Sequence, residues 1–394
     1  MTSVEAGDLP DGIYFDLDED VYHAIEALGS TDLKELHLSA GDFWAGSWLD
    51  PDKPDEEDPT DAQILGKAYH VARLEPERFK CAYIREPQKE ECDKESLLTS
   101  DTDIKRELKK LDQTQALKDE AIEERADRLV EAGYKGEIWH LIKRDYERER
   151  TATKPHKIGI AGKYFDDIIR DMKRIAAHKE ISALLKGGQA EVSILWTDAN
   201  GIRCKARVDY LTVAHWADMK TFANPNGKIL EKCITDAFRY NQYYMQATHY
   251  DEAVEMIRLG VVEIQGDASD VQRALIDQIK ERDVRLDCYY VFQQKGGVPN
   301  LLAFKFQFMQ IDIYRDYEIK AMLEDENQQA IAKEMMSARS GLWMRGRREV
   351  QRAKEVFMLY SQTYLEGEPW HPIEAIRSLG DADFPDRWIQ GEWQ

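Results

Sequence analysis

Two aspartates and a lysine near the middle of the chain form a pattern that suits chemistry on phosphate. Asp209 is followed by Asp218 and Lys220, and Glu191 lies upstream. Carboxylate oxygens are the ligands that Mg²⁺ prefers, and the ion keeps several waters besides. A bound ion polarises a phosphate and makes hydroxide available near neutral pH. We therefore expect Asp209 and Asp218 to bind Mg²⁺, for which Mn²⁺ can substitute, with Glu191 and the Met219 carbonyl as further ligands. Lys220 would supply a positive charge to the nucleophile or the phosphate.

Three short strand-like segments separated by turn residues must position these side chains. They lie between residues 190 and 221, and their spacing is typical of a β-meander. Side chains alternate across a strand, so one face of the second segment is predicted to carry Lys205, Arg207 and Asp209. By the same alternation, Asp218 and Lys220 share a face of the third segment. Two acids and a lysine on adjacent strands can then point into one hollow.

A helix-like pattern follows the meander over residues 238–259. Four of its residues fall at spacings of four, three and four, which puts them on one helical face: Arg239, Tyr243, Gln246 and Tyr250. This face is predicted to orient Lys220 and a phosphate backbone.

These residues also carry a resemblance to known nucleases. Val208-Asp209 followed by Asp218-Met219-Lys220 resembles the PD-(D/E)xK nuclease signature, with Val where the pattern often has Pro. Gln246-xxx-Tyr250 resembles the QxxxY motif of the RecB-like branch. Upstream, the segment 65–79 is similar to the RecE-type phage exonucleases (exodeoxyribonuclease VIII, with a PDDEXK-like domain). In that family a Gly-x-Ala-x-His helix, here ending in His70, brings a histidine to the metal site.

The resemblance implies an activity and partners. We expect a Mg²⁺-dependent exodeoxyribonuclease that degrades linear double-stranded DNA from 5′ to 3′ and leaves 3′ single-stranded tails for recombination by strand annealing. A single-strand annealing protein, a ring-shaped homo-oligomer and a phage-encoded protein in the bacterial cytoplasm are implied as well. The expected catalytic residues are Asp209, Asp218, Lys220, Gln246 and Tyr250. The expected DNA contacts are Lys205, Arg207, Arg239, Tyr243, Lys154 and Lys157.

Net charge sets the main objection to a nucleic-acid partner. The chain of 394 residues has a formal charge of −21, from 54 Lys and Arg against 75 Asp and Glu. Affinity for nucleic acid comes largely from neutralised phosphates, so this balance counts against DNA binding. A protein that encloses DNA needs only a positive channel, however. Two alternatives stay open: an endonuclease or nicking defence enzyme on the same fold, and a non-catalytic acidic DNA mimic or inhibitor.

Cysteine usage and hydropathy exclude other classes. The 5 cysteines are scattered and include no C-x-x-C pair, which argues against structural zinc, an iron–sulfur cluster and disulfides, and favours a reducing cytoplasm. No stretch approaches the 18 or more apolar residues of a membrane span.

The pattern predicts an α/β (α+β) fold with a PD-(D/E)xK core, a central mixed sheet flanked by helices. We divide the chain into an N-terminal helical part (1–85), a helical insertion (86–155) and the main nuclease core with C-terminal helices (156–394). The insertion weakly resembles SAP-like inserts of phage exonucleases, but a solvated helical insertion of mixed charge is the favoured interpretation. Lys154 and Lys157, near its end, are candidate phosphate contacts. A long amphipathic helix over 162–185, a hairpin over 286–310 and helices over 313–337 and 342–366 complete the expected core.

Overall fold

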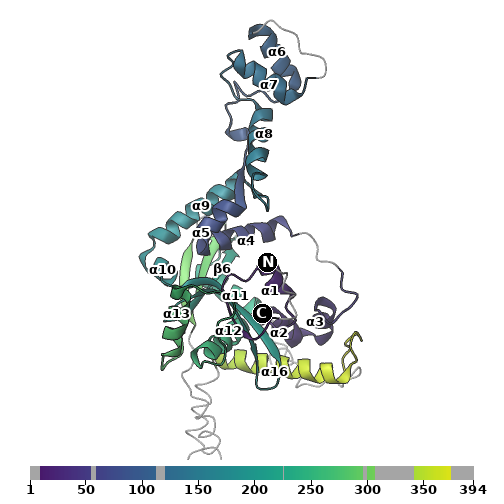
Figure 1. Ribbon diagram of the computed structural model, residues 1–394, viewed down its shortest axis with the longest axis vertical. Coiled ribbons are helices and arrows are strands. Elements are labelled where there is room, and N and C mark those ends of the chain that lie inside the picture. Colours follow the sequence, from purple (N-terminus) through teal and green to yellow (C-terminus); the bar gives the residue numbers. More distant parts are fainter. Residues whose placement is uncertain are drawn as a thin grey trace, which may run out of the picture.

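The computed structural model describes residues 9–54, 59–111, 120–224, 226–295, 300–306 and 341–373. Its centre is a six-stranded sheet in the order β1-β4-β5-β6-β7-β8, flanked by helices, and a slender helical arm stands away from this body (Figure 1). The strands are β1 (Gly12–Tyr14), β4 (Gln189–Thr197), β5 (Arg203–Leu211), β6 (His215–Ala223), β7 (Asp287–Lys295) and β8 (Leu301–Phe306). The predicted fold class is confirmed.

The predicted meander is present as β4, β5 and β6, paired antiparallel in that order. A tight turn joins β4 to β5: the Asp198 carboxylate accepts hydrogen bonds from the N–H groups of Asn200 and Ile202, and Gly201 takes a positive φ of 80°. β6 pairs in parallel with β7, and β7 forms the expected hairpin with β8. Residues 307–310 of that expected hairpin and the helix expected over 313–337 lie outside the described residues.

One layer of helices covers the face of the sheet that holds the main core. It contains α2 (Ser30–Leu38), α11 (Leu230–Tyr240), α12 (Tyr243–Arg258), α13 (Asp270–Lys280) and α16 (Leu342–Thr363). Trp196, Val208 and Trp216 of the sheet are fully buried against this layer. The last helix, predicted over 342–366, is α16, which crosses α12 closely (Figure 1).

The other face is covered by α4 (Asp61–Leu74), α9 (Gly162–Ala177) and α10 (Lys179–Leu184). Leu74, Ile175 and Ile181 pack there on Ala217 and Met219 of β6. The helix predicted over 162–185 is therefore two helices. His178 separates them because its backbone is extended and its Nδ1 accepts a hydrogen bond from the Ile181 N–H, which caps α10.

The arm contains most of the predicted insertion. It leaves the core after α5 (Pro76–Ala82) and β2 (Tyr83–Glu86), and the chain returns through β3 (Ile158–Ala161), which pairs in parallel with β2. Between them lie α6 (Asp101–Leu111), α7 (Ile122–Glu131) and α8 (Trp139–Arg150), with α6 and α7 at the far end (Figure 1). The arm has its own small core, made by Leu98, Ile104, Leu108, Ala126, Leu129 and Ile138.

Candidate active site

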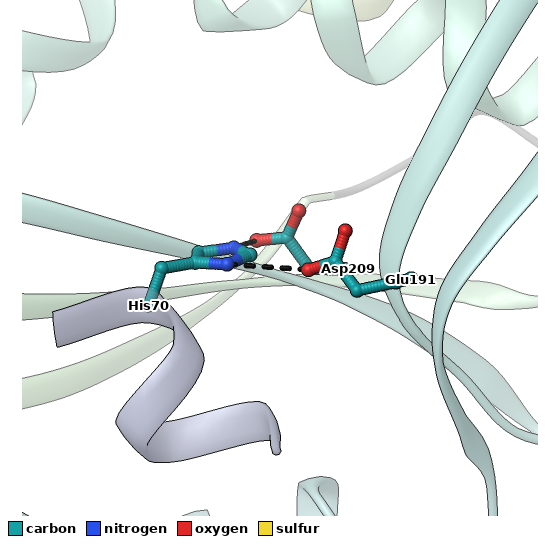
Figure 2. Close-up of side chains that lie close together, drawn as sticks. All are labelled: His70, Glu191 and Asp209. Carbon is teal, nitrogen blue, oxygen red and sulfur yellow. Dashed lines mark ion pairs between the residues drawn. The ribbon is translucent and has the colours of Figure 1, made fainter. Parts of the chain in front are cut away.

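His70 bridges two carboxylates at the point where α4 meets the meander. Its Nε2 lies 2.9 Å from Asp209 Oδ2, and its Nδ1 lies 3.2 Å from Glu191 Oε1 (Figure 2). Each of the three residues offers a ligand atom, and these atoms all lie within 4.8 Å of one another. α4 presents His70 because Thr60 and Gln63 form a capping box at its start and its apolar residues pack on the core.

Asp218 and Lys220 form a second pair on β6. Asp218 is completely buried, and its Oδ2 lies 2.6 Å from Lys220 Nζ. Its Oδ1 accepts a hydrogen bond of 2.9 Å from Gln246 Nε2 on α12. Gln246 therefore fixes the orientation of the Asp218 carboxylate, whereas its helix face was predicted to orient Lys220.

The two strands β5 and β6 separate at the aspartates. Their last residue pairs are Leu211 with Trp216 and Tyr210 with Ala217. Beyond them the Met219 N–H donates to Asp209 Oδ2 at 2.7 Å instead of to a strand partner. The carboxylate of Asp209 thus occupies the gap between the strands, beside the backbone of the residue whose carbonyl was predicted as a metal ligand.

Strict alternation fails in β5 next to Asp209. Val208 and Leu211 both pack in the main core although they are three residues apart, whereas Tyr210 packs on the opposite side. The irregularity has a partner in β4: Glu191 has a φ of +54° and interrupts the pairing between Ala190–Tyr210 and Val192–Val208. Alternation therefore breaks at Asp209, between Val208 in the main core and Tyr210 on the opposite side.

Lys205 and Arg207 lie on the side covered by α1 (Glu19–Ala24). Lys205 is buried, and its Nζ donates to the carbonyls of Tyr22, His23 and Ile25 at 3.3, 3.1 and 2.8 Å, at the end of that helix. It is therefore a structural residue that stabilises a helix C-terminus, not the DNA contact that alternation suggested.

Arg207 is also turned inward, so its assignment as a DNA contact needs the same correction. Its Nε donates to Ser193 Oγ at 3.0 Å and lies 3.6 Å from Glu191 Oε2, and its guanidinium covers the Tyr22 ring. A further guanidinium nitrogen donates to the Leu17 carbonyl. Arg207 therefore holds Glu191 in its unusual backbone conformation.

The predicted helix over 238–259 is broken, which separates Arg239 from the other members of its predicted face. α11 ends at Tyr240, where Asn241 Nδ2 donates to the Ala237 carbonyl, and Gln242 takes a left-handed φ of 50° before α12 begins. Arg239 is exposed and lies over Tyr240. Its role as a DNA contact stays a prediction.

Tyr250 is buried in the core, and the partly buried Tyr243 packs against it. Tyr243 stacks on Tyr290, with ring centroids 5.9 Å apart, and the Lys220 ammonium lies 5.0 Å from its ring centroid. The Lys220 ammonium group thus lies against the Tyr243 ring. With Tyr290 stacked on it as well, this ring is not open for stacking with a DNA base. Tyr250 is buried near Trp216, and burial raises the pKa of its hydroxyl to about 12.

The two lysines near the end of the arm differ in whether they pair with an acid. Lys157 Nζ lies 3.0 Å from Glu149 Oε1, whereas Lys154 is exposed. The basic residues of α8 are largely paired as well: Arg144 with Asp127, Arg148 with Asp145, and Arg150 with Glu147. These pairs fit the solvated interpretation of the insertion, and phosphate binding by Lys154 and Lys157 stays a prediction.

The ionisable groups of the site differ in the direction of their pKa shifts. Burial opposes the protonation of His70, but the Asp209 and Glu191 carboxylates outweigh it and raise the pKa of the imidazole to about 9. Burial raises the pKa of Glu191 to about 7 against the opposing effect of His70. Burial and then the Asp209 charge raise the pKa of Asp218 to about 6. Despite its burial, Asp209 has a lowered pKa because His70 pairs with it. This concentration of carboxylates favours an added cation.

The donor set fits a divalent metal ion. Glu191 and Asp209 offer carboxylate oxygens, which hard cations such as Mg²⁺ prefer, and His70 offers an imidazole nitrogen. The His70 imidazole spans the two acids, with one ring nitrogen toward each carboxylate. Asp218 stands outside this group of three, engaged by Gln246 and Lys220.

Sequence reasoning missed Lys34. This lysine lies on α2, and its Nζ is 5.5 Å from the centroid of the same Tyr243 ring that Lys220 approaches. The sequence around it indicated only a helix with Leu33 and Leu36 facing inward, because nothing local relates residue 34 to residue 220.

Comparison with known proteins agrees with this geometry. Residues 140–261 match the model of a PDDEXK-like domain of unknown function (DUF3799). The matched segment, which is less than half of the chain, is similar to PDDEXK-like domains. The matched segment includes Glu191, Asp209, Asp218, Lys220 and the Gln246-xxx-Tyr250 motif, but neither His70 nor Lys34.

Other comparisons add less. A crystal structure from Eubacterium rectale, provisionally described as an exonuclease, is 13% identical and covers 87% of this chain and 88% of its own, with a TM-score of 0.37. Curated protein sequences give no significant match. No helix among the described residues is both long and apolar enough to cross a membrane.

Proposed function

We propose that the protein is a divalent-metal-dependent deoxyribonuclease. The observation that carries this proposal is the convergence of His70, Glu191 and Asp209 within 4.8 Å, beside the Asp218–Lys220 pair. These residues come from α4, β4, β5 and β6, so four elements of the fold contribute to one small polar centre. The match to a PDDEXK-like domain over the central segment supports it.

Each residue has a distinct task in this proposal. His70, Glu191 and Asp209 would hold the ion. The ion would polarise the phosphate as a Lewis acid and would make hydroxide available near neutral pH. Lys220 places an ammonium group, a compact point charge, beside the buried Asp218. Gln246 orients Asp218, and Arg207 holds Glu191. Burial of the centre strengthens these electrostatic interactions.

The finer part of the proposal concerns the substrate. We infer an exonuclease that uses Mg²⁺, or Mn²⁺ in its place, and acts at the ends of linear double-stranded DNA from 5′ to 3′. Its support is the resemblance to RecE-type exonucleases, above all the His70 helix. The same resemblance motivates a ring-shaped homo-oligomer, an annealing-protein partner and a phage origin. A ring would also reconcile DNA binding with the charge of −21, because only its inner surface would need to be positive.

Cleavage of labelled DNA tests both parts. With Mg²⁺, we expect degradation of end-labelled linear duplex and no cutting of a covalently closed circle. Asp218→Ala should lower cleavage at least about a thousandfold, as loss of a principal electrostatic group does, with an unchanged circular dichroism spectrum. The exposed Asp277→Ala is the matched control for loss of one carboxylate.

The other outcomes are equally informative. Rapid cutting of circles would establish an endonuclease and overturn the exonuclease proposal. Full activity in Asp218→Ala would overturn the site. No cleavage with any divalent ion, together with binding to a basic DNA-binding protein, would favour the acidic DNA mimic.

A further inference from the structure

Two lysines from different parts of the chain approach one aromatic ring. Lys220 Nζ lies 5.0 Å and Lys34 Nζ lies 5.5 Å from the centroid of Tyr243. Tyr243 itself is fixed by stacking on Tyr290 and by contact with Phe238. The ring therefore sets a common position for two ammonium groups at the edge of the candidate active site.

The two ammonium groups differ in their partners. Lys220 is paired with Asp218 at 2.6 Å. Lys34 makes no ion pair with a carboxylate among the residues that the structure describes, although it is only partly exposed. Burial and then repulsion from Lys220 lower its pKa to about 8. The Asp218 carboxylate opposes this shift. Because no carboxylate among the described residues pairs directly with Lys34, an anionic ligand beside it would be favourable.

The position of Lys34 is fixed by its helix. Leu33 and Leu36 on either side of it are buried in the main core, and α2 packs on both α12 and α16. At the start of α2, Asp32 Oδ2 accepts a hydrogen bond of 2.6 Å from the Gly29 N–H. The helix therefore holds the lysine toward Tyr243, whereas a lysine on a surface loop could turn freely into solvent.

We propose that Lys34 binds an internal phosphodiester phosphate of the substrate strand, next to the position of Lys220. This inference rests on the proposed function. An ammonium group on a flexible stem is a compact charge well suited to a phosphate oxygen. The anion would neutralise Lys34 as Asp218 neutralises Lys220, and cation–π contact with Tyr243 would keep both stems in place.

Two substitutions of Lys34 test the proposal. Lys34→Gln removes the charge and Lys34→Arg keeps it, and the exposed Lys179→Gln on α10 is the control for loss of one lysine. Binding to duplex DNA is measured with Ca²⁺ in place of Mg²⁺ over a range of salt concentrations. For Lys34→Gln we expect the slope of log Kd against log salt to fall by about one, the change for one lost phosphate contact. Lys34→Arg and Lys179→Gln should keep the wild-type slope.

Cleavage provides a second readout. With Mg²⁺, kcat/KM of Lys34→Gln should fall at least about tenfold, roughly the effect of one lost charge-assisted contact, equally on duplexes with 5′-phosphoryl and 5′-hydroxyl ends. A deficit confined to 5′-phosphoryl ends would overturn the internal placement in favour of a terminal phosphate. An unchanged salt slope and unchanged cleavage, with an unchanged melting temperature, would overturn the phosphate site.

Failure of the proposed function would look different. If the wild-type protein cleaves no DNA, the nuclease proposal fails. The salt slope measured with Ca²⁺ still tests whether Lys34 contacts a phosphate.

Discussion

Glu191, a candidate metal ligand, carries backbone strain in β4. A φ of +54° is the left-handed region, which costs a non-glycine residue about 1 kcal/mol or more. The pairing between β4 and β5 is interrupted at this residue, and Arg207 braces its carboxylate. Strain held in place by neighbouring contacts is common at functional sites because it directs a side chain that regular structure would place elsewhere.

Two substitutions of Glu191 separate strain from function. Both Glu191→Ala and Glu191→Gly remove the carboxylate and should weaken Mn²⁺ binding, measured by calorimetry. Glycine tolerates a positive φ, so the Gly variant should be more stable than the Ala variant by about 1 kcal/mol in urea unfolding. Equal stability of the two variants would show that the left-handed backbone is not retained in solution.

His249 gives the protein an acid-sensitive core. It is completely buried beside Trp196, with its Nε2 3.0 Å from the Lys205 carbonyl, and burial lowers its pKa to about 4. In the unfolded chain a histidine has a pKa of about 6.5, so the unfolded state binds the extra proton between these two values. The contribution of His249 to stability is therefore present above about pH 6.5 and is lost as the pH falls toward 4.

The pH dependence can be assigned by comparing variants. Between pH 7 and pH 5 the wild type should lose about 2 kcal/mol of unfolding free energy more than His249→Gln does. Urea unfolding at the two pH values measures both. Because the site carboxylates titrate alike in the two proteins, equal losses would mean that His249 is not the group responsible.

The residue types of the site could be predicted from the sequence, but the directions in which several side chains point could not. Asp209, Asp218, Lys220, Gln246 and the meander followed from spacing and resemblance. The break in alternation at Asp209 could not be predicted, because no glycine or proline in β5 marks it. It lies opposite Glu191, whose unusual backbone conformation is on another strand. The packing of Lys205 and Arg207 under α1 did not follow either, because α1 lies far from them in the sequence.

At the scale of elements, α12 connects the site to the outer helix. Gln246 lies on its inner side, and α16 packs on its outer side. Gly346 permits this packing: a Cβ atom there would lie 2.3 Å from Thr248 Oγ1 and 2.5 Å from the Tyr244 carbonyl oxygen. Buried Lys354 of α16 adds ion pairs, 3.1 Å from Asp198 and 2.8 Å from Glu252.

Substitution of Gly346 should disturb this helix pair. Gly346→Ala is expected to destabilise the protein by about 1–3 kcal/mol, since backbone must move to admit the methyl group. Gly341→Ala, where a Cβ would meet nothing within 4 Å, is the matched control. Thermal unfolding measures both, and similar melting temperatures for the two variants would contradict the close crossing.

Element boundaries were predicted less well than element types. The strands, α4 and α16 were expected from hydrophobic periodicity and turn residues. The breaks at His178 and at Asn241–Gln242 were not, because each depends on one polar side chain satisfying a backbone group: His178 accepts from Ile181, and Asn241 donates to Ala237.

At the scale of the whole molecule, the arm and the core have separate interiors. Among the described residues, the arm core is made by residues between Leu98 and Leu141, and no residue of the candidate site lies in it. The arm joins the body through α8 and the β2–β3 pair, over a cavity of about 790 Å³ lined in part by Phe79, Tyr83, Tyr146 and Phe165.

Removal of the arm should therefore leave the site intact. A variant in which a flexible Gly/Ser linker of about a dozen residues replaces residues 90–155 should fold and keep Mn²⁺ affinity within about threefold of wild type. Calorimetry and circular dichroism measure these properties. Loss of the folded core would show that the arm is needed for the stability of the core. The deletion would expose the aromatic side chains that line the cavity, so reduced solubility is an expected side effect.

The candidate centre is assembled from distant parts of the chain: Lys34 and His70 precede the arm, whereas Glu191, Asp218 and Gln246 follow it. Bringing these segments together requires closure of long loops, which is slow compared with local helix formation. A ribosome-bound chain that has emerged only as far as the arm would hold His70 without its acidic partners. On the proposed function, cleavage would thus begin only after the chain has emerged past Gln246.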